Sequence, residues 1–201
     1  MIYLASRSPR RRELLQQVGV RFEPLLFREG SRADGDTDES EEPGENPDAY
    51  VRRVTLMKAN AAWSRVTMRR GLQKKPVLVA DTTVALGNEI LGKPADRADA
   101  ERILGLLSGT RHCVLTAVAV ILESRVEMLV SESHVTFSQI TPDRIAAYVA
   151  SGEPFDKAGA YGIQGRAAAF IERIEGSYSG IMGLPLHETV TLLTKFGIAV
   201  T

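Results

Sequence analysis

Cysteine is almost absent from this 201-residue sequence, in which Cys113 is the only one. A single cysteine excludes an internal disulfide, and with it the class of small, disulfide-rich secreted domains. Cys113 begins the apolar run Cys113–Leu122, so we expect a buried, inert thiol rather than a nucleophile. This usage fits a reducing compartment, and we expect a cytoplasmic protein.

Long apolar runs and an excess of charge are absent as well. No stretch approaches the roughly 18 consecutive apolar residues of a membrane-spanning helix, and Ile2–Ala5 follow Met1 without the basic region and apolar core of an export signal. The 25 Lys and Arg residues balance the 25 Asp and Glu residues, which leaves no overall positive field for nucleic acid or an anionic membrane. We expect neither as a partner, and a polyanionic ligand must be bound by local charges.

The length suits one well-packed domain, residues 1–201, or two small lobes that share a cleft. Its central feature is Val77–Ala80, a short apolar run typical of a strand buried on both faces. This run places Asp81 at the carboxyl end of the predicted strand, where ligands collect in α/β folds.

A hairpin is predicted directly after Asp81. Thr83–Leu86 and Glu89–Leu91 are strand-like, and the two-residue turn between them is led by Gly87, which favours type II′. The hairpin would fold Lys93 back towards Asp81. A carboxylate and an ammonium group there could bind a metal and a phosphate; the alternative is a surface ion pair.

The N-terminal segment predicts a strand over Met1–Ala5 and then a helix. Ser8 is the expected N-cap, Pro9 the first helical residue, and Gly19 follows the end. Arg10–Arg12 in the first turn oppose the helix macrodipole, which indicates that an anion binds there. Free N–H groups, serine hydroxyls and guanidinium groups together suit phosphate; alternatively the arginines point into solvent.

An acidic segment follows a second predicted strand, Phe22–Phe27. Arg28–Asp48 carries nine acidic residues, so we expect a long loop. Asp38 and Glu39 lie shortly before a helix and could hold a divalent cation over a cleft. The alternative is a loop whose charges are simply solvated.

The next helix is predicted to begin at Asn46-Pro47. Lys58 lies at the edge of its apolar side, where a lysine either extends its ammonium group into water or reaches a bound anion. The residues expected on the buried side are Tyr50, Val51, Val54, Met57 and Ala61.

Further elements are predicted along the second half of the chain. They are a helix capped by Asp96 and ended by Ser108-Gly109, a hairpin of Arg111–Leu122 and Arg125–Phe137 joined at Glu123-Ser124, a helix from Thr141-Pro142 to Ser151-Gly152, a strand over Ala167–Ile174, a turn at Gly176–Gly180, and a helix from Leu184-Pro185 to Gly197. The four glycines of Gly152–Gly165 indicate a loop whose backbone closely approaches something. The three histidines show no metal-ligand spacing and are expected to be ordinary.

Several of these segments together resemble the Maf family of nucleoside triphosphate pyrophosphatases over nearly the whole chain. The matching stretches are Leu4–Arg11, Tyr50–Arg53 with Lys58-Ala59, Ala80–Thr82 with Gly92–Pro94, Leu107–Gly109, Phe155–Gly165 and Gly183–Pro185. Six matches in the same order make the resemblance specific.

The resemblance implies a mixed α/β fold, of the Maf and inosine triphosphatase kind, with an elongated central sheet flanked by helices and two lobes around a nucleotide cleft. It also implies hydrolysis of a nucleoside triphosphate to the monophosphate and pyrophosphate with Mg²⁺ or Mn²⁺. A homodimer is possible. Within the family, the chain is most similar to the dTTP and UTP pyrophosphatases.

The resemblance also assigns roles to residues. Asp81 is the proton acceptor, Lys93 and Glu39 complete the catalytic group, and Asp81 and Glu39 hold the metal; Glu39 is chosen by counting back from Tyr50. A carboxylate can take a proton from water beside a metal, because the metal lowers the pKa of that water from 15.7 to about 7. The substrate-binding residues are Ser6, Ser8, Arg10, Arg11, Lys58, Thr82, Asp156, Lys157 and Gln164, of which Arg11, Thr82 and Gln164 set specificity.

Three alternatives stay open from the sequence. The chain could act on 7-methyl-GTP, like other members of the family. It could bind a nucleotide without turnover and regulate septum formation. An aspartyl-phosphate phosphatase would need a second acid two residues after Asp81, where Thr83 stands.

Overall fold

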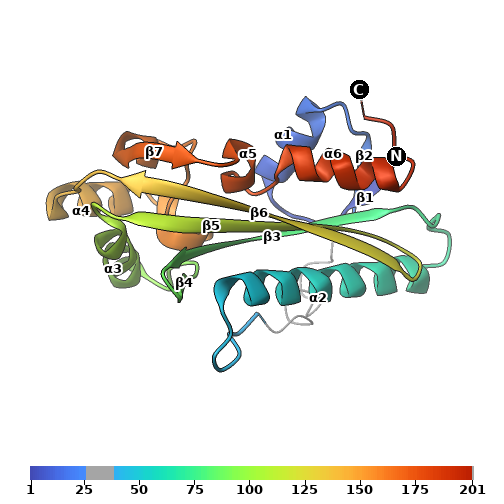
Figure 1. The fold of residues 1–201 in the computed structure, drawn as a ribbon, viewed down its shortest axis with the longest axis horizontal. Helices are drawn as coiled ribbons and strands as arrows, with labels where there is room; N and C mark the ends of the chain where they lie inside the picture. Colours follow the sequence, from blue (N-terminus) through green and yellow to red (C-terminus); the bar gives the residue numbers. More distant parts are fainter. Residues whose placement is uncertain (26–38, 201) are drawn as a thin grey trace.

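A seven-stranded mixed sheet runs the length of the molecule, and the computed structural model describes residues 1–25 and 39–200 around it (Figure 1). The strand order is β2-β1-β3-β5-β6-β7, and β4 pairs with β3. The strands are β1 (Ile2–Leu4), β2 (Phe22–Pro24), β3 (Val77–Leu86), β4 (Glu89–Leu91), β5 (Arg111–Leu122), β6 (Arg125–Phe137) and β7 (Ile171–Glu175). Pairing is parallel for β1 with β2 and β3, and antiparallel elsewhere. The predicted mixed α/β architecture is confirmed.

Helices cover both faces of this sheet (Figure 1). They are α1 (Pro9–Gln17), α2 (Pro47–Met68), α3 (Arg97–Leu107), α4 (Pro142–Ala150), α5 (Tyr178–Ile181) and α6 (Leu186–Lys195), with short 3₁₀ helices η1 (Glu153–Asp156), η2 (Ala158–Ala160) and η3 (Arg166–Phe170). α2 packs on one face through Ala59, Ala62 and Val66, and leucines of α1 and α6 pack on the other. No helix within the described ranges is long and apolar enough to cross a membrane.

Three N-cap signals and the predicted hairpin turn are confirmed. Ser8, Asn46 and Asp96 each accept a hydrogen bond from the backbone N–H three residues on, as N-caps do. Gly87 has φ of +60° at the first turn position between β3 and β4, which fits the predicted type II′ turn. β2 is shorter than expected and ends at Pro24; Leu26 and Phe27 lie outside the described residues.

The central strand differs from the prediction. Two strands, Val77–Ala80 and Thr83–Leu86, were expected, but β3 runs unbroken through both. β5 pairs with β3 from Val77 to Ala85, so antiparallel hydrogen bonding continues past the polar residues in its middle. Asp81 therefore lies inside a strand, opposite Ala117, and not at a strand's carboxyl end.

The other edge of β3 explains why a site can still form at Asp81. β1 pairs only with Val77 and Leu78, and β4 pairs only from Val84 onward. Between them, no strand of the described residues pairs with Val79–Thr83 on this side. We call this segment the open edge. The loop after β1 begins at one end of the open edge, and the loop after β4 begins at the other end.

The segment before α6 corrects two further predictions. A strand over Ala167–Ile174 was expected, but η3 occupies its first half and β7 starts at Ile171. The first half holds three alanines and no β-branched residue, so it lacks strand preference. The expected turn at Gly176–Gly180 instead contains the start of α5, which Ser177 caps by accepting from Gly180 N–H.

Candidate active site

Lys58 lies between two carboxylates beside the open edge. Its Nζ is 2.7 Å from Asp81 Oδ1 on β3 and 2.8 Å from Glu39 Oε1, which precedes α2. These two oxygens are therefore at most 5.5 Å apart. The Asp81 side chain is only 15% exposed and is largely withdrawn from water, whereas the Glu39 side chain is 43% exposed.

The electrostatics of Lys58 follow from these neighbours. Burial acts to lower its pKa, but the charges of Asp81 and Glu39 outweigh burial and hold the pKa above the usual value. Lys58 is thus a charged ammonium group at neutral pH. Lys58 pairs with two carboxylates of the protein and does not simply extend into water, and its contact with a bound anion stays a prediction.

Tyr50 fixes the position of Glu39. Its hydroxyl donates to the Glu39 backbone carbonyl at 2.9 Å. Burial, followed by the Asp81 and Glu39 charges, raises the pKa of Tyr50 to about 12, so the phenol keeps the proton that it donates. Tyr50, Met57 and Ala61 were predicted on the buried side of the helix, but each of them is only half-buried. The apolar pattern could not show that Tyr50 also serves as a donor.

Arg11 joins three segments of the chain. Its Nε donates to the Gly183 carbonyl at 2.7 Å, and its terminal nitrogens donate to Thr82 Oγ1 at 3.3 Å and to Ser6 Oγ at 3.4 Å. Burial lowers its pKa, an effect that the Asp81 charge opposes. Ser8 Oγ accepts from Arg11 N–H, so the same turn is held at its backbone.

Thr116 belongs to this network, although the sequence did not single it out. It lies opposite Thr82 in the β3–β5 pairing, and its hydroxyl donates to Thr82 Oγ1 at 3.0 Å or to the Gly180 carbonyl at 2.8 Å. A hydroxyl inside the apolar run of β5 was the available signal.

Asp156 is flanked by two of the predicted cations. Arg10 reaches its carboxylate at 4.0 Å, and Lys157 contacts it more closely while donating to the Glu153 carbonyl at 2.5 Å. Burial acts to raise the pKa of Asp156, but Lys157 and then Arg10 hold it below its usual value. The first turn of α1 thereby approaches the end of η1.

Comparison with known proteins gives this arrangement a family. The sequence profile described as "Maf-like protein" matches residues 1–196. The chain belongs to the Maf-like family. It is 58% identical to the dTTP/UTP pyrophosphatase of Cupriavidus metallidurans, with 98% of each chain covered. It is 54% identical to the dTTP/UTP pyrophosphatase of Dechloromonas aromatica, with 98% of this chain and 97% of that one covered.

A solved structure has a fold similar to that of this Maf-like chain. The Staphylococcus aureus Ham1 protein matches 97% of this chain and 96% of its own length with a TM-score of 0.50. The sequences are 12% identical, so the likeness concerns the fold alone.

The glycine-rich loop of the Maf-like chain closely approaches β3. A Cβ at Gly159 would lie 2.8 Å from Val84 Cγ1, and Gly159 has φ of +69°, so only glycine fits without strain. Gly159 N–H donates to the Gly92 carbonyl at 3.1 Å. The close approach predicted for this loop is therefore made, at least in part, to β3 and to the Gly92 carbonyl. These contacts hold the glycine-rich loop beside Lys93.

Two of the predicted site residues take part in none of the contacts described above. Lys93 and Gln164 are both exposed. Within the described parts of the chain, neither has a hydrogen bond or ion pair. Their side chains are therefore available to a ligand, but no contact ties them to Asp81. Asp38, the other acidic candidate, lies outside the described residues.

A divalent cation fits the residues around Lys58. Mg²⁺ and Mn²⁺ take oxygen ligands, and carboxylates are their main protein donors. Asp81 and Glu39 already meet around one positive group, the Lys58 ammonium. These two residues would hold the metal.

Proposed function

We propose that this chain hydrolyses dTTP and UTP to the monophosphate and pyrophosphate. The observation that carries the proposal is the convergence of Asp81 and Glu39 on Lys58, beside the open edge of β3. The Maf-like relatives named dTTP/UTP pyrophosphatase support the choice of reaction and substrate. The nucleotide would lie along the open edge, in the cytoplasm, where these substrates are made and used.

Asp81 is the proposed proton acceptor. Its carboxylate would take the proton of the water that attacks the α-phosphorus, while pyrophosphate leaves. Lys58 holds Asp81 and Glu39 in place before substrate binds, and its flexible ammonium group would then turn to a phosphate oxygen. A bound divalent cation supplies charge that offsets the phosphates and makes water more acidic.

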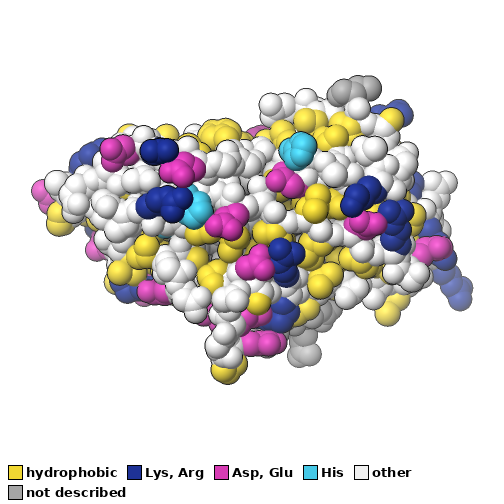
Figure 2. All heavy atoms as spheres, viewed as in Figure 1, with side chains coloured by type: hydrophobic (Ala, Val, Ile, Leu, Met, Phe, Trp, Pro, Cys, Tyr) yellow, Lys and Arg dark blue, Asp and Glu magenta, His cyan; other side chains and the backbone are white. Residues whose placement is uncertain are grey.

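The remaining charges would bind the triphosphate. A triphosphate carries close to four negative charges, and a protein of zero net charge must meet them with local cations. On the face drawn in Figure 2, acidic and basic side chains are interspersed and do not gather by sign. We assign this role to Arg10, Arg11, Lys58, Lys93 and Lys157. Ser6 and Ser8 would orient the loop between β1 and α1, and Asp156 would orient the glycine-rich loop.

The reaction is tested by its products and by metal removal. Incubation of purified protein with UTP and Mg²⁺ or Mn²⁺ is expected to release pyrophosphate and UMP, and a chelator is expected to abolish turnover. Chromatography of the nucleotides and separate assays for pyrophosphate and orthophosphate give the answer. Orthophosphate as the first product, or equal turnover with chelator, would contradict the mechanism. Binding without turnover under every condition would favour a nucleotide-binding regulator.

Base selectivity is proposed to depend on Gln164, with Arg11 and Thr82. Uracil and thymine present carbonyl acceptors and one N3–H donor, and a glutamine amide can match both. Gln164→Glu would place an acceptor against a carbonyl oxygen once the base has excluded water, at a cost of about 1–3 kcal/mol. We expect kcat/KM for UTP to fall about 5- to 150-fold, with less discrimination against other bases.

Gln73→Glu is the matched control, because Gln73 is also an exposed glutamine. It should leave the selectivity among UTP, dTTP, CTP and 7-methyl-GTP unchanged. Wild-type preference for 7-methyl-GTP would show that the substrate is misassigned. Unchanged discrimination in Gln164→Glu would show that another residue contacts the base. A homodimer remains a prediction.

A further inference from the structure

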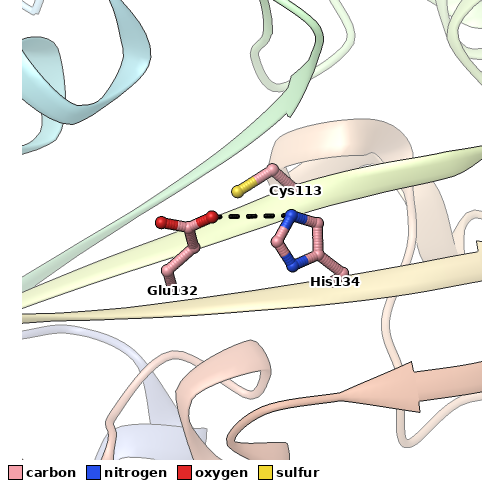
Figure 3. A group of neighbouring side chains, drawn as sticks. All are labelled: Cys113, Glu132 and His134. Carbon is pink, nitrogen blue, oxygen red and sulfur yellow. Dashed lines mark ion pairs between the residues drawn. The ribbon is translucent and has the colours of Figure 1, made fainter.

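A second group of ligand-type side chains lies on the same face of the sheet as α2, beyond the start of that helix. α2 begins at Pro47, and among the described residues the sheet face beyond this point forms one wall of a pocket of about 510 Å³. The wall carries Cys113 of β5 and Glu132 and His134 of β6. Their side chains converge in the pocket (Figure 3).

The three side chains are close enough to share one ion. One ligand atom from each, Cys113 Sγ, a Glu132 carboxylate oxygen and a His134 ring nitrogen, lies within 4.8 Å of the others. His134 Nε2 and Glu132 Oε1 are 3.5 Å apart. Zinc bond lengths of about 2.0–2.3 Å at tetrahedral angles require ligand atoms roughly 3.3–3.6 Å apart. One pair already meets this requirement, and the sulfur needs a shift of little more than about 1 Å.

We propose that Cys113, Glu132 and His134 form a binding site for Zn²⁺. Thiolate, imidazole and carboxylate are the donors that zinc combines, whereas Mg²⁺ and Mn²⁺ prefer oxygen alone. Three protein ligands leave the fourth tetrahedral position to water, since the carboxylate of Asp48, which also lines the pocket, is bonded to Arg52 at 2.7 Å. Zn²⁺ replaces the thiol proton of Cys113, and this proton is released to the solvent.

This site is separate from the Asp81 and Glu39 pair. Cys113 lies opposite Ala85 of β3, four residues beyond Asp81, which corresponds to about 13 Å along a strand. One ion could not bind both groups. The nearby Arg111 lines the same pocket, but its guanidinium group is paired with Glu175 at 3.2 Å.

The sequence contained the signal for this cluster, although histidine spacing did not show it. The hairpin predicted around Glu123-Ser124 pairs Leu122 with Arg125, and continuing that register places Cys113 opposite His134. Glu132 is two residues before His134 and shares its face. Cys113 was expected to be buried, but it is only half-buried and lines the pocket.

The test uses the full chain, reduced and stripped of metal, with excess Mg²⁺ to occupy oxygen-only sites. Calorimetric titration with Zn²⁺ is expected to show one tight site. Cys113→Ser and His134→Gln should each weaken it by at least about 10- to 100-fold, the loss caused by removing even an outer-shell partner. His187→Gln removes an exposed histidine on α6 and is the control that should keep full affinity.

Substitution with Co²⁺ tests the sulfur ligand in the wild-type chain itself. A thiolate-to-cobalt charge-transfer absorption is expected in the wild type and in His187→Gln, and it should vanish in Cys113→Ser. Thermal melts without metal show whether each variant is folded. Absence of the charge-transfer absorption in the wild type would overturn the proposal. Zinc affinity that survives both ligand substitutions would overturn it as well.

Discussion

Replacing Asp81 with asparagine is expected to lower kcat by about 10²–10⁴, the range for losing general acid–base catalysis. Asparagine keeps the size of the side chain but cannot accept a proton, and it is a weaker ligand for a divalent cation. The fold should survive, because the amide oxygen can still accept from Lys58, which also keeps its contact with Glu39. Steady-state rates with UTP, measured with saturating metal, give the comparison.

The matched control is Asp143→Asn, the same change at an exposed carboxylate in the first turn of α4. It should leave kcat unaltered. Melting curves of both variants should match the wild type within the small effects of surface changes. A normal kcat in Asp81→Asn, together with a normal melting curve, would make Asp81 structural and place the base elsewhere.

Local signals in the sequence predicted most elements of this fold. N-caps at Ser8, Asn46 and Asp96 fixed the starts of three helices, because a cap depends only on residues a few positions away. The continuous strand through Asp81 was missed, since its backbone is held by β5, which lies about 35 residues further along. Pairing between distant segments is not contained in local preference.

The candidate site shows the same difference between local signals and contacts between distant segments. The sequence and the family resemblance gave Asp81, Glu39 and Lys58 as separate candidates, and the structure places them in direct contact. The partners of Arg11 were not predictable, because Gly183 and Thr82 lie 172 and 71 residues away and offer ordinary polar atoms. A backbone carbonyl has no side-chain signal at all.

The contacts also separate the five proposed phosphate-binding cations into two groups. Arg10 and Lys157 share Asp156, Lys58 lies between Asp81 and Glu39, and Arg11 is bonded to Gly183 and Thr82. Phosphate must compete with these partners. Lys93 differs, because no described residue forms an ion pair or hydrogen bond with it. Its full charge is available to the substrate.

Lys93→Gln is therefore expected to lower kcat/KM for UTP by about 10²–10³ without changing the melting temperature. The magnitude is that of removing one donor aimed at charge that develops in the transition state. Stability should not change, because an exposed side chain that has no partner among residues 1–25 and 39–200 contributes little to folding. Lys93→Arg keeps the charge and should recover part of the rate.

Lys74→Gln is the control, since Lys74 is an exposed lysine whose contact is a surface pair with Glu123 at 3.3 Å. It removes the same charge from the protein and should leave kcat/KM unchanged, which separates a local contact from a general field effect. Near-normal kcat/KM in Lys93→Gln would exclude Lys93 from the reaction. Equal losses in both variants would mean that the net charge of the protein attracts the nucleotide, and that the position of Lys93 beside the open edge does not matter.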